Sequence, residues 1–267
     1  MSTAADALRN GDLSALLGAA TAAVKTAPAD VGARWLLAEV LLATGEIERA
    51  DRVLDAAVLG EPNPAIFEFR HLLRAEALRS QVLRDGRPPK YQGDDVTPAQ
   101  LAAMKVRMLL RLGDAAGASE ASEEVEALRP RVQGRIELAG GETAAFADLR
   151  DADDTFAAEF EVLTTAGEYM LVPVERVASL VFDAPRRLRD LIWRRCAIDL
   201  KDGTEGVVFL PALYMGPAAE TVDALRLGRS TEWSDPSTGP VRGRGQRILV
   251  AGDEAPSFTE IAKLVFD

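Results

Sequence analysis

The sequence predicts an α+β protein, in which a tetratricopeptide-like helical repeat domain, residues 1–132, precedes a β-rich domain, residues 133–267, built as a small sheet or barrel. Three observations predict this class: a 34-residue period in the first half, helical spacing of the apolar residues around it, and short apolar runs between turn residues after Pro130. With 267 residues, 48% of them hydrophobic and 27% charged, the chain can form two folded domains.

The first half contains a repeat in its glycines and prolines. Three glycines are each followed by a proline 17 residues later, in the pairs Gly11 and Pro28, Gly45 and Pro62, and Gly113 and Pro130. The glycines lie 34 and then 68 residues apart, and 34 residues is the length of a tetratricopeptide repeat, a two-helix hairpin. Glycine suits the turn between the helices, and proline ends the second helix. A plain helical bundle with coincidental glycines is the alternative.

Apolar residues at helical spacing predict the buried faces of these helices. The stripes are Leu13, Leu16, Leu17, Ala20 and Val24; Ile47, Ala50, Val53, Leu54, Ala57 and Val58; and Leu101, Met104, Met108 and Leu112. Between the second and third units, residues 65–83 predict one helix, followed by a polar loop that contains Pro88 and Pro89. We interpret this slot as a degenerate repeat.

After Pro130 the pattern becomes that of strands. Strands are predicted at residues 133–138, 159–163, 169–173, 179–182, 197–200, 207–210 and 246–251, and a final helix or strand at 259–266. Residues 201–206 separate two of these runs with a glycine-containing turn, which predicts a hairpin.

Residues able to carry out catalysis are scarce. The chain has one histidine, His71, and one cysteine, Cys196, so it offers neither an intramolecular disulfide nor a zinc site built from these types. His71 falls on a predicted helix, and Cys196 begins an apolar strand, where a buried and inert thiol is expected. We therefore expect no enzyme activity, no catalytic residue, no bound metal and no cofactor.

One acidic cluster keeps an alternative open. Asp148, Asp151, Asp153 and Asp154 could bind Mg²⁺ or Ca²⁺, as in a metal-binding regulator or an enzyme, although their spacing does not match an EF-hand loop. The plainer interpretation is a solvated loop, or a set of partners for a later group of arginines. That group is Arg186, Arg187, Arg189, Arg194 and Arg195, which flank Trp193.

The charge balance limits the classes of partner. The formal net charge is −11, which disfavours nucleic acid and anionic membrane surfaces. Residues 186–247 carry 11 basic and 8 acidic side chains, so this stretch could also dock on an acidic protein. The first twelve residues contain no apolar run typical of a secretory signal, and residues 207–219 are too short and proline-broken to span a bilayer. We expect a cytoplasmic protein.

Several segments of the second half together resemble a known family. They are DLRDADD at 148–154, Val172-Pro173 with Arg176, PRRLRDLIW at 185–193, DGTEG at 202–206, FLPALY at 209–214, Leu227-Gly228-Arg229, Trp233, GPVRG at 239–243 and GQR at 245–247. In this order they look like the ImpE family, also called TagJ or SciE-type, whose members begin with tetratricopeptide-like helices. The resemblance implies a non-enzymatic accessory protein of the bacterial type VI secretion system. It also implies binding to the N-terminal helix of the small sheath subunit and a link to a ClpV-type AAA+ ATPase.

Helical repeats stack into concave surfaces that suit a partner helix or extended peptide. On the predicted groove side of the second repeat, and at the start of the next helix, lie the candidate partner-binding residues Trp35, Glu39, Leu42, Phe67, Phe69 and Arg70. Aromatic residues and arginine are frequent interface anchors, although aromatics also serve as core residues.

Overall fold

The computed structural model describes residues 4–57 and 63–267 of the chain. Its first half is helical, with α1 Ala4–Asn10, α2 Leu13–Thr26, α3 Val31–Ala43, α4 Ile47–Asp55, α5 Pro64–Ser80, α6 Pro98–Leu112 and α7 Ala115–Leu128. One irregular helical turn, Gln81–Asp85, extends α5, so the single helix predicted in the middle slot is confirmed.

The three repeat glycines do form the turns of helical hairpins. Gly11, Gly45 and Gly113 join α1 to α2, α3 to α4 and α6 to α7, and all three have left-handed φ angles between 73° and 80°. Pro28 precedes α3 and Pro130 follows α7, as the repeat predicts, whereas Val58 and Pro62 lie outside the described residues.

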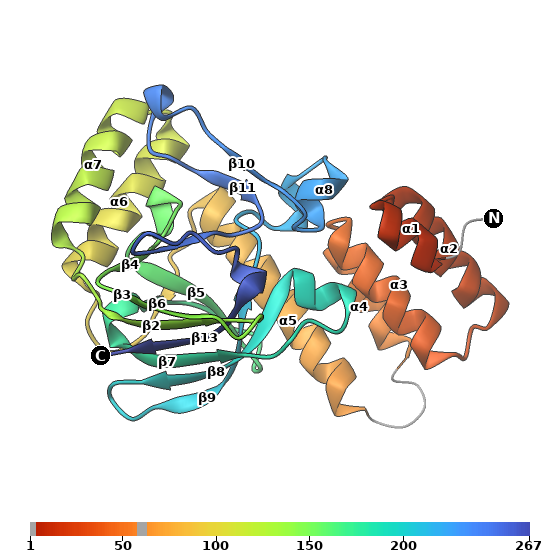
Figure 1. The fold of residues 1–267 in the computed structure, drawn as a ribbon. Coiled ribbons are helices and arrows are strands. Elements are labelled where there is room, and N and C mark those ends of the chain that lie inside the picture. The colour runs from red at the N-terminus through yellow and green to blue at the C-terminus, as the bar shows by residue number, and fades with distance from the viewer. Residues whose placement is uncertain (1–3, 58–62) are drawn as a thin grey trace.

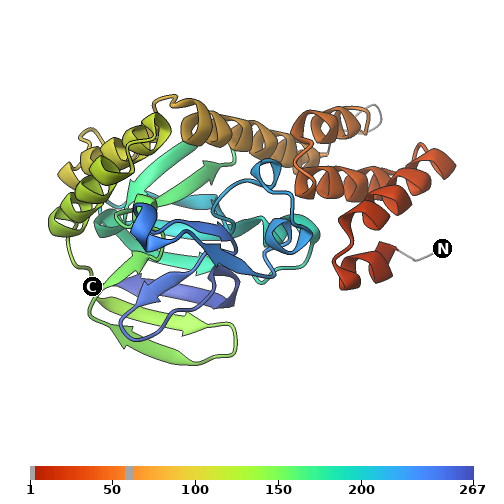
Figure 2. The same ribbon diagram turned by 90° about the horizontal axis from the view of Figure 1, so that it is seen from above.

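The third hairpin does not join the stack of the first two. Figure 2 shows α6 and α7 at one end of the molecule and α1 to α4 at the other, with the sheet between them. Within the described residues, α6 and α7 form a separate apolar cluster with Ala157 and Ala158, which precede β5. The period therefore locates the third hairpin in the sequence, but it is wrong as a guide to a continuous superhelix.

The second half, joined by the short strand β1 from the loop before α6, forms an open, largely antiparallel sheet of nine strands in the order β1-β6-β5-β9-β8-β7-β13-β2-β3. Its strands are β1 Lys90–Tyr91, β2 Gly134–Leu138, β3 Thr143–Phe146, β5 Glu159–Thr164, β6 Tyr169–Pro173, β7 Val177–Phe182, β8 Trp193–Leu200, β9 Glu205–Pro211 and β13 Ile261–Phe266. Two small ribbons pair β4 Leu149–Asp151 with β12 Leu249–Ala251, and β10 Thr231–Trp233 with β11 Gly243–Gly245. A short helix, α8 Asp223–Arg226, precedes β10.

The predicted strands are all present, and the final segment proves to be a strand, β13. The predicted hairpin is β8–β9, whose turn contains Gly203 at a φ of 86°. Short strands β1, β3, β4, β10 and β11 were not predicted, because two to four residues are too few for a period-two pattern to stand out.

Helix α5 connects the two halves (Figure 1). Phe69 and Leu73 on α5 share one apolar cluster with Leu163 of β5, Leu171 of β6 and Trp193 of β8. A second cluster includes Leu180 and Leu264 and also takes residues from β5, β6 and β8, such as Val162, Val172 and Ile198. The change from helix to strand falls at the expected place in the sequence, but the core crosses it. The division into domains 1–132 and 133–267 stays a prediction.

Among the described helices, none combines the length and the apolar composition that a membrane crossing would need.

Candidate functional site

The structure places the predicted partner-binding residues in the junction between the helical half and the sheet. Leu42 and Phe69 are fully buried, and Glu39 is 4% exposed, so these three contribute to the core and not to an open groove. Trp35 contacts two of them: its ring lies 5.3 Å from that of Phe69, and its indole nitrogen donates to Glu39 at 2.7 Å. Burial raises the pKa of Glu39.

Arginines from the segment before β8 cover this junction. Arg187 and Arg189 lie over the ring of Trp35 at 4.9 and 5.2 Å, in cation–π contact. Arg70 pairs with Asp51 and Asp55 of α4, while Phe67 is 40% exposed. A contact with a partner stays a prediction for the accessible residues Trp35, Phe67 and Arg70. For Leu42, Phe69 and Glu39 we correct the expected exposure, because the C-terminal half covers the face that the sequence left open.

The helical half does carry a shallow groove between α4 and α5, with a volume of about 320 Å³. Four of its seven lining residues are charged: Glu48, Asp51, Arg52 and Arg74. Since a groove that buries the apolar face of a helix is mainly apolar, this surface fits such a partner poorly.

The acidic cluster is engaged within the protein, but not by the arginines that the sequence suggested. Asp148 pairs with Arg129 and Arg131, and Asp151 pairs with Arg247. Asp154 pairs with Arg150 and also accepts from the Val241 backbone N–H at 2.7 Å. Asp153 accepts three hydrogen bonds from Thr155 and Gly243.

The predicted pairing of this cluster with arginines 186–195 is therefore wrong. Arg195 pairs with Asp183, Arg189 with Glu68 and Asp190, and Arg194 donates to the backbone carbonyls of Asp183, Phe258 and Ile261. Over the residues that the structure describes, no group of three or more His, Cys, Asp or Glu is placed to hold a metal ion. The metal-binding alternative thus finds no geometry to support it.

A buried polar network joins α5 to the sheet. Arg79 donates to Glu161 of β5 at 2.8 and 3.0 Å and to the carbonyl oxygens of Leu213 and Tyr214. Arg247 pairs with both Glu161 and Asp151. Burial alone would raise the pKa of Glu161, but Arg79 and Arg247 hold it below its ordinary value. Arg79, Arg247, Glu161 and Asp151 each pair with a side chain of opposite charge. The network is therefore a structural connection between α5 and the sheet.

The other titratable candidates are also held by structural contacts. Burial, and then the charge of Asp151, raises the pKa of Asp153 to about 6, yet its carboxylate oxygens are occupied by backbone N–H groups and the Thr155 hydroxyl. Burial raises the pKa of the Cys196 thiol to about 12, which keeps it protonated and unreactive. His71 Nδ1 lies 2.8 Å from the carbonyl oxygen of Thr165.

Helix α6 presents two different faces, and its inner face combines small apolar residues with two buried polar side chains. Thr97 begins the helix with a capping box that uses Gln100. Gln100 is fully buried and donates to Glu159 of β5 at 3.1 Å, and Arg107 donates to the same carboxylate at 2.6 Å. Small residues complete the buried face and allow close packing on α7. They are Ala99, Ala102, Ala103 and Val106.

The outer face of α6 is apolar and exposed. Leu101, Met104, Met108 and Leu112 expose 50%, 42%, 45% and 73% of their surface, and they follow one another at helical spacing. The prediction that this stripe faces the core is wrong: the buried face is the opposite one, where Gln100 and Arg107 bond to Glu159 and small residues pack on α7. We call these four residues the α6 stripe.

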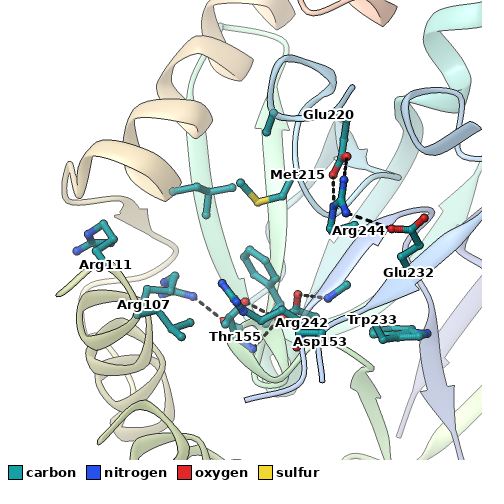
Figure 3. A pocket seen from close by; sticks show the side chains of 16 residues that line it. Arg107, Arg111, Asp153, Thr155, Met215, Glu220, Glu232, Trp233, Arg242 and Arg244 are labelled. Atoms are coloured by element: carbon teal, nitrogen blue, oxygen red, sulfur yellow. Dashed lines mark hydrogen bonds and ion pairs between the residues drawn. The ribbon is translucent and has the colours of Figure 1, made fainter. Parts of the chain in front are cut away.

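A cavity of about 490 Å³ lies between α6 and the β10–β11 ribbon (Figure 3). Its apolar lining residues are Leu83, Leu110, Phe156, Met215, Ala219 and Trp233. Trp233 is 44% exposed and packs edge-on against Tyr214. Gly243 allows the ribbon to lie directly on that ring, because a Cβ there would fall 2.1 Å from a Tyr214 ring carbon.

Charged side chains line the same cavity. Arg244 pairs with the buried Glu220 and with Glu232. Arg107 is neutralised by Glu159. Arg111 and Arg242 are exposed, and within the described part of the chain neither has an acidic partner. The cavity therefore contains two arginines without a carboxylate partner, together with the aromatic side chains of Phe156 and Trp233.

Comparison with known proteins gives this arrangement a context. The tetratricopeptide repeat model matches residues 7–72, and the model of the ImpE protein matches residues 143–265. Over 99% of its length the chain is 33% identical to the type VI secretion system accessory component TagJ of Pseudomonas aeruginosa, of which the match covers 91%. The chain belongs to the ImpE family.

A solved structure shares the whole architecture. The crystal structure of a protein from Vibrio parahaemolyticus superposes with a TM-score of 0.87 and 25% sequence identity, and the match covers 99% of this ImpE chain and 97% of the other. Within this ImpE protein, the residues after β3 that line the cavity fall inside the ImpE match, whereas α6 falls between the two matched regions.

Neither the α6 stripe nor the cavity was recognised as a site from the sequence. One signal was present: buried Gln100 and Arg107 share the inner face of α6, while the large apolar residues share the other. Which of these faces is covered depends on Glu159, 52 residues or more further along the chain.

Proposed function

We propose that this protein is a non-enzymatic accessory adaptor of a bacterial type VI secretion system, working in the cytoplasm. Its partner is the N-terminal helix of the small sheath subunit, and it assists sheath assembly or recycling together with a ClpV-type ATPase. Membership of the ImpE family and likeness to a protein named as an accessory component support the secretion role. The α6 stripe is the observation that carries the adaptor role.

The α6 stripe has the form expected of a surface that binds a helix. From Leu101 to Leu112 it extends over roughly 16 Å, about three turns, which matches the apolar face of a short amphipathic helix. Two of its four residues are methionines, whose flexible thioether chains adapt to a partner surface. An exposed run of large apolar side chains on a folded protein marks an interaction site.

A catalytic role has less support. His71, Cys196 and the acidic cluster are each engaged by structural contacts, as described above. The adaptor function therefore depends on a surface and not on a reactive group.

The test is isothermal titration of a peptide with the sequence of the sheath-subunit N-terminal helix into the full chain. We expect binding to the wild type and at least about tenfold weaker binding to the Met104→Glu, Met108→Glu double variant, because two charges would be buried against the apolar face of the partner. Both residues are exposed, so the variant should keep its thermal stability.

Val31→Glu is the matched control, since Val31 is a 42% exposed helical residue near the other end of the molecule. It should bind the peptide as the wild type does. Equal affinity of the double variant and the wild type would exclude the α6 stripe as the docking surface, and no binding by the wild type would exclude sheath-helix binding.

A further inference from the structure

We propose that the cavity beside α6 is the second part of this docking surface, and that it binds an acidic side chain from the same partner helix. This inference rests on the proposed function and deepens it. The α6 stripe requires an apolar face on the partner helix, and the cavity adds the requirement of a negatively charged side chain. The partner is then an amphipathic helix whose carboxylates lie along one edge of its apolar face.

The acidic side chains that line the cavity already have partners. Glu220 and Glu232 both pair with Arg244, and the Asp153 carboxylate accepts from backbone amides and a hydroxyl. Arg111 and Arg242 line the same cavity, are exposed, and have no carboxylate partner among the described residues. Each of these guanidinium groups can donate paired hydrogen bonds to an incoming carboxylate.

The shape of the site keeps these arginines accessible. The guanidinium of Arg111 lies against Gly86, where a Cβ would fall 2.9 Å from its Nε. Gly86 has a φ of 77°, which glycine adopts without strain. The lack of a side chain at Gly86 also leaves room for the Arg111 guanidinium. On the facing wall, the backbone of Arg242 is fixed by two hydrogen bonds with Ser234 at 2.9 Å each. Figure 3 shows Arg111 on α6 and Arg242 on the side that also carries Trp233.

The cavity and the α6 stripe adjoin each other. On a helix, residues three or four apart are neighbours on the surface. Met104 is therefore next to Arg107, and Met108 is next to Arg111, so the C-terminal part of the stripe borders the cavity. Its other border carries the Lys105–Glu124 pair, which is already neutral. A partner on the stripe meets free positive charge on one side only.

The wall of the cavity supplies apolar contacts. Trp233 is 44% exposed and lines the cavity together with Leu83, Leu110 and Met215. An exposed tryptophan and arginines without acidic partners in one cavity have the composition of a binding hot spot. A carboxylate bound here would be partly shielded from water, which strengthens its attraction to the guanidinium groups.

A double-mutant cycle by titration calorimetry tests the proposal on the full chain. One axis is Arg111→Gln with Arg242→Gln, which keeps size and polarity but removes the charge. The other is the sheath-helix peptide with its acidic residues replaced by the corresponding amides. We expect about fivefold weaker binding for each arginine removed, and a much smaller loss when the peptide already lacks its carboxylates.

Arg135→Gln is the matched control, because Arg135 is an exposed arginine on β2, away from the cavity. It should leave affinity unchanged, and the wild-type interaction should weaken as salt is raised. If the peptide binds the wild type and the two-arginine variant equally, the cavity proposal is overturned while the proposed function stands. If the wild type does not bind the peptide, both are overturned.

Discussion

At the scale of single residues, two of the repeat glycines have the same backbone conformation but different packing around them. Gly45 and Gly113 have nearly equal φ angles, 80° and 77°, and each turns one helix of a hairpin into the next. Their surroundings differ. A Cβ on Gly45 would lie 2.4 Å from the Cα of Ala218, whereas a Cβ on Gly113 would meet nothing within 4 Å. Gly45 is therefore also the point where the turn between α3 and α4 touches the C-terminal half.

This difference predicts unequal costs for the same substitution. Gly113→Ala should lower the free energy of unfolding by about 1–2 kcal/mol, the cost of a left-handed alanine. Gly45→Ala should lower it by a further ~1–3 kcal/mol, because the backbone at Ala218 must move. Urea unfolding of the two variants measures the difference, and equal losses would show that the contact with Ala218 contributes nothing.

At the scale of elements, α6 shows how a buried carboxylate can set the orientation of a helix. Glu159 binds both Gln100 and Arg107, two turns apart, so the polar side of α6 faces the sheet. Periodicity of the apolar residues was enough to predict the helix. It predicted the wrong buried face, because periodicity assigns the apolar side of a helix to the core and the polar side to solvent. In α6 two polar side chains have buried partners instead.

Two carboxylates that each pair with a cation of α6 provide the test. Glu159→Ala should lower the free energy of unfolding by about 3–5 kcal/mol, since Arg107, 8% exposed, would keep its charge without a partner. Glu124→Ala removes the exposed partner of Lys105 and should cost no more than about 1 kcal/mol. Similar losses by chemical denaturation would mean that Glu159 does not hold the helix.

At the scale of the whole molecule, the two halves share a core. α5 places Phe69 and Arg79 against side chains of β5 and β8, and α6 with α7 packs on residues that precede β5. We expect a fragment of residues 1–132 to lack a cooperative unfolding transition, because it would expose these faces to water. Circular dichroism during urea titration of the fragment and the full chain measures this. A sharp transition in the fragment would show that the helical half folds alone.

The sequence by itself determined the local features of this protein: the helical hairpins with their glycine turns, the strands longer than four residues, the lack of a metal-binding pattern in its one histidine and one cysteine, and the family resemblance. Each depends on residues close together in the chain. Only the tertiary structure decided which faces are covered, why Leu42 and Phe69 are core, and why the α6 stripe and the cavity are open. These outcomes depend on contacts such as Glu159 with Arg107 and Arg79 with Glu161, which join residues 52 and 82 positions apart, and no local pattern encodes them.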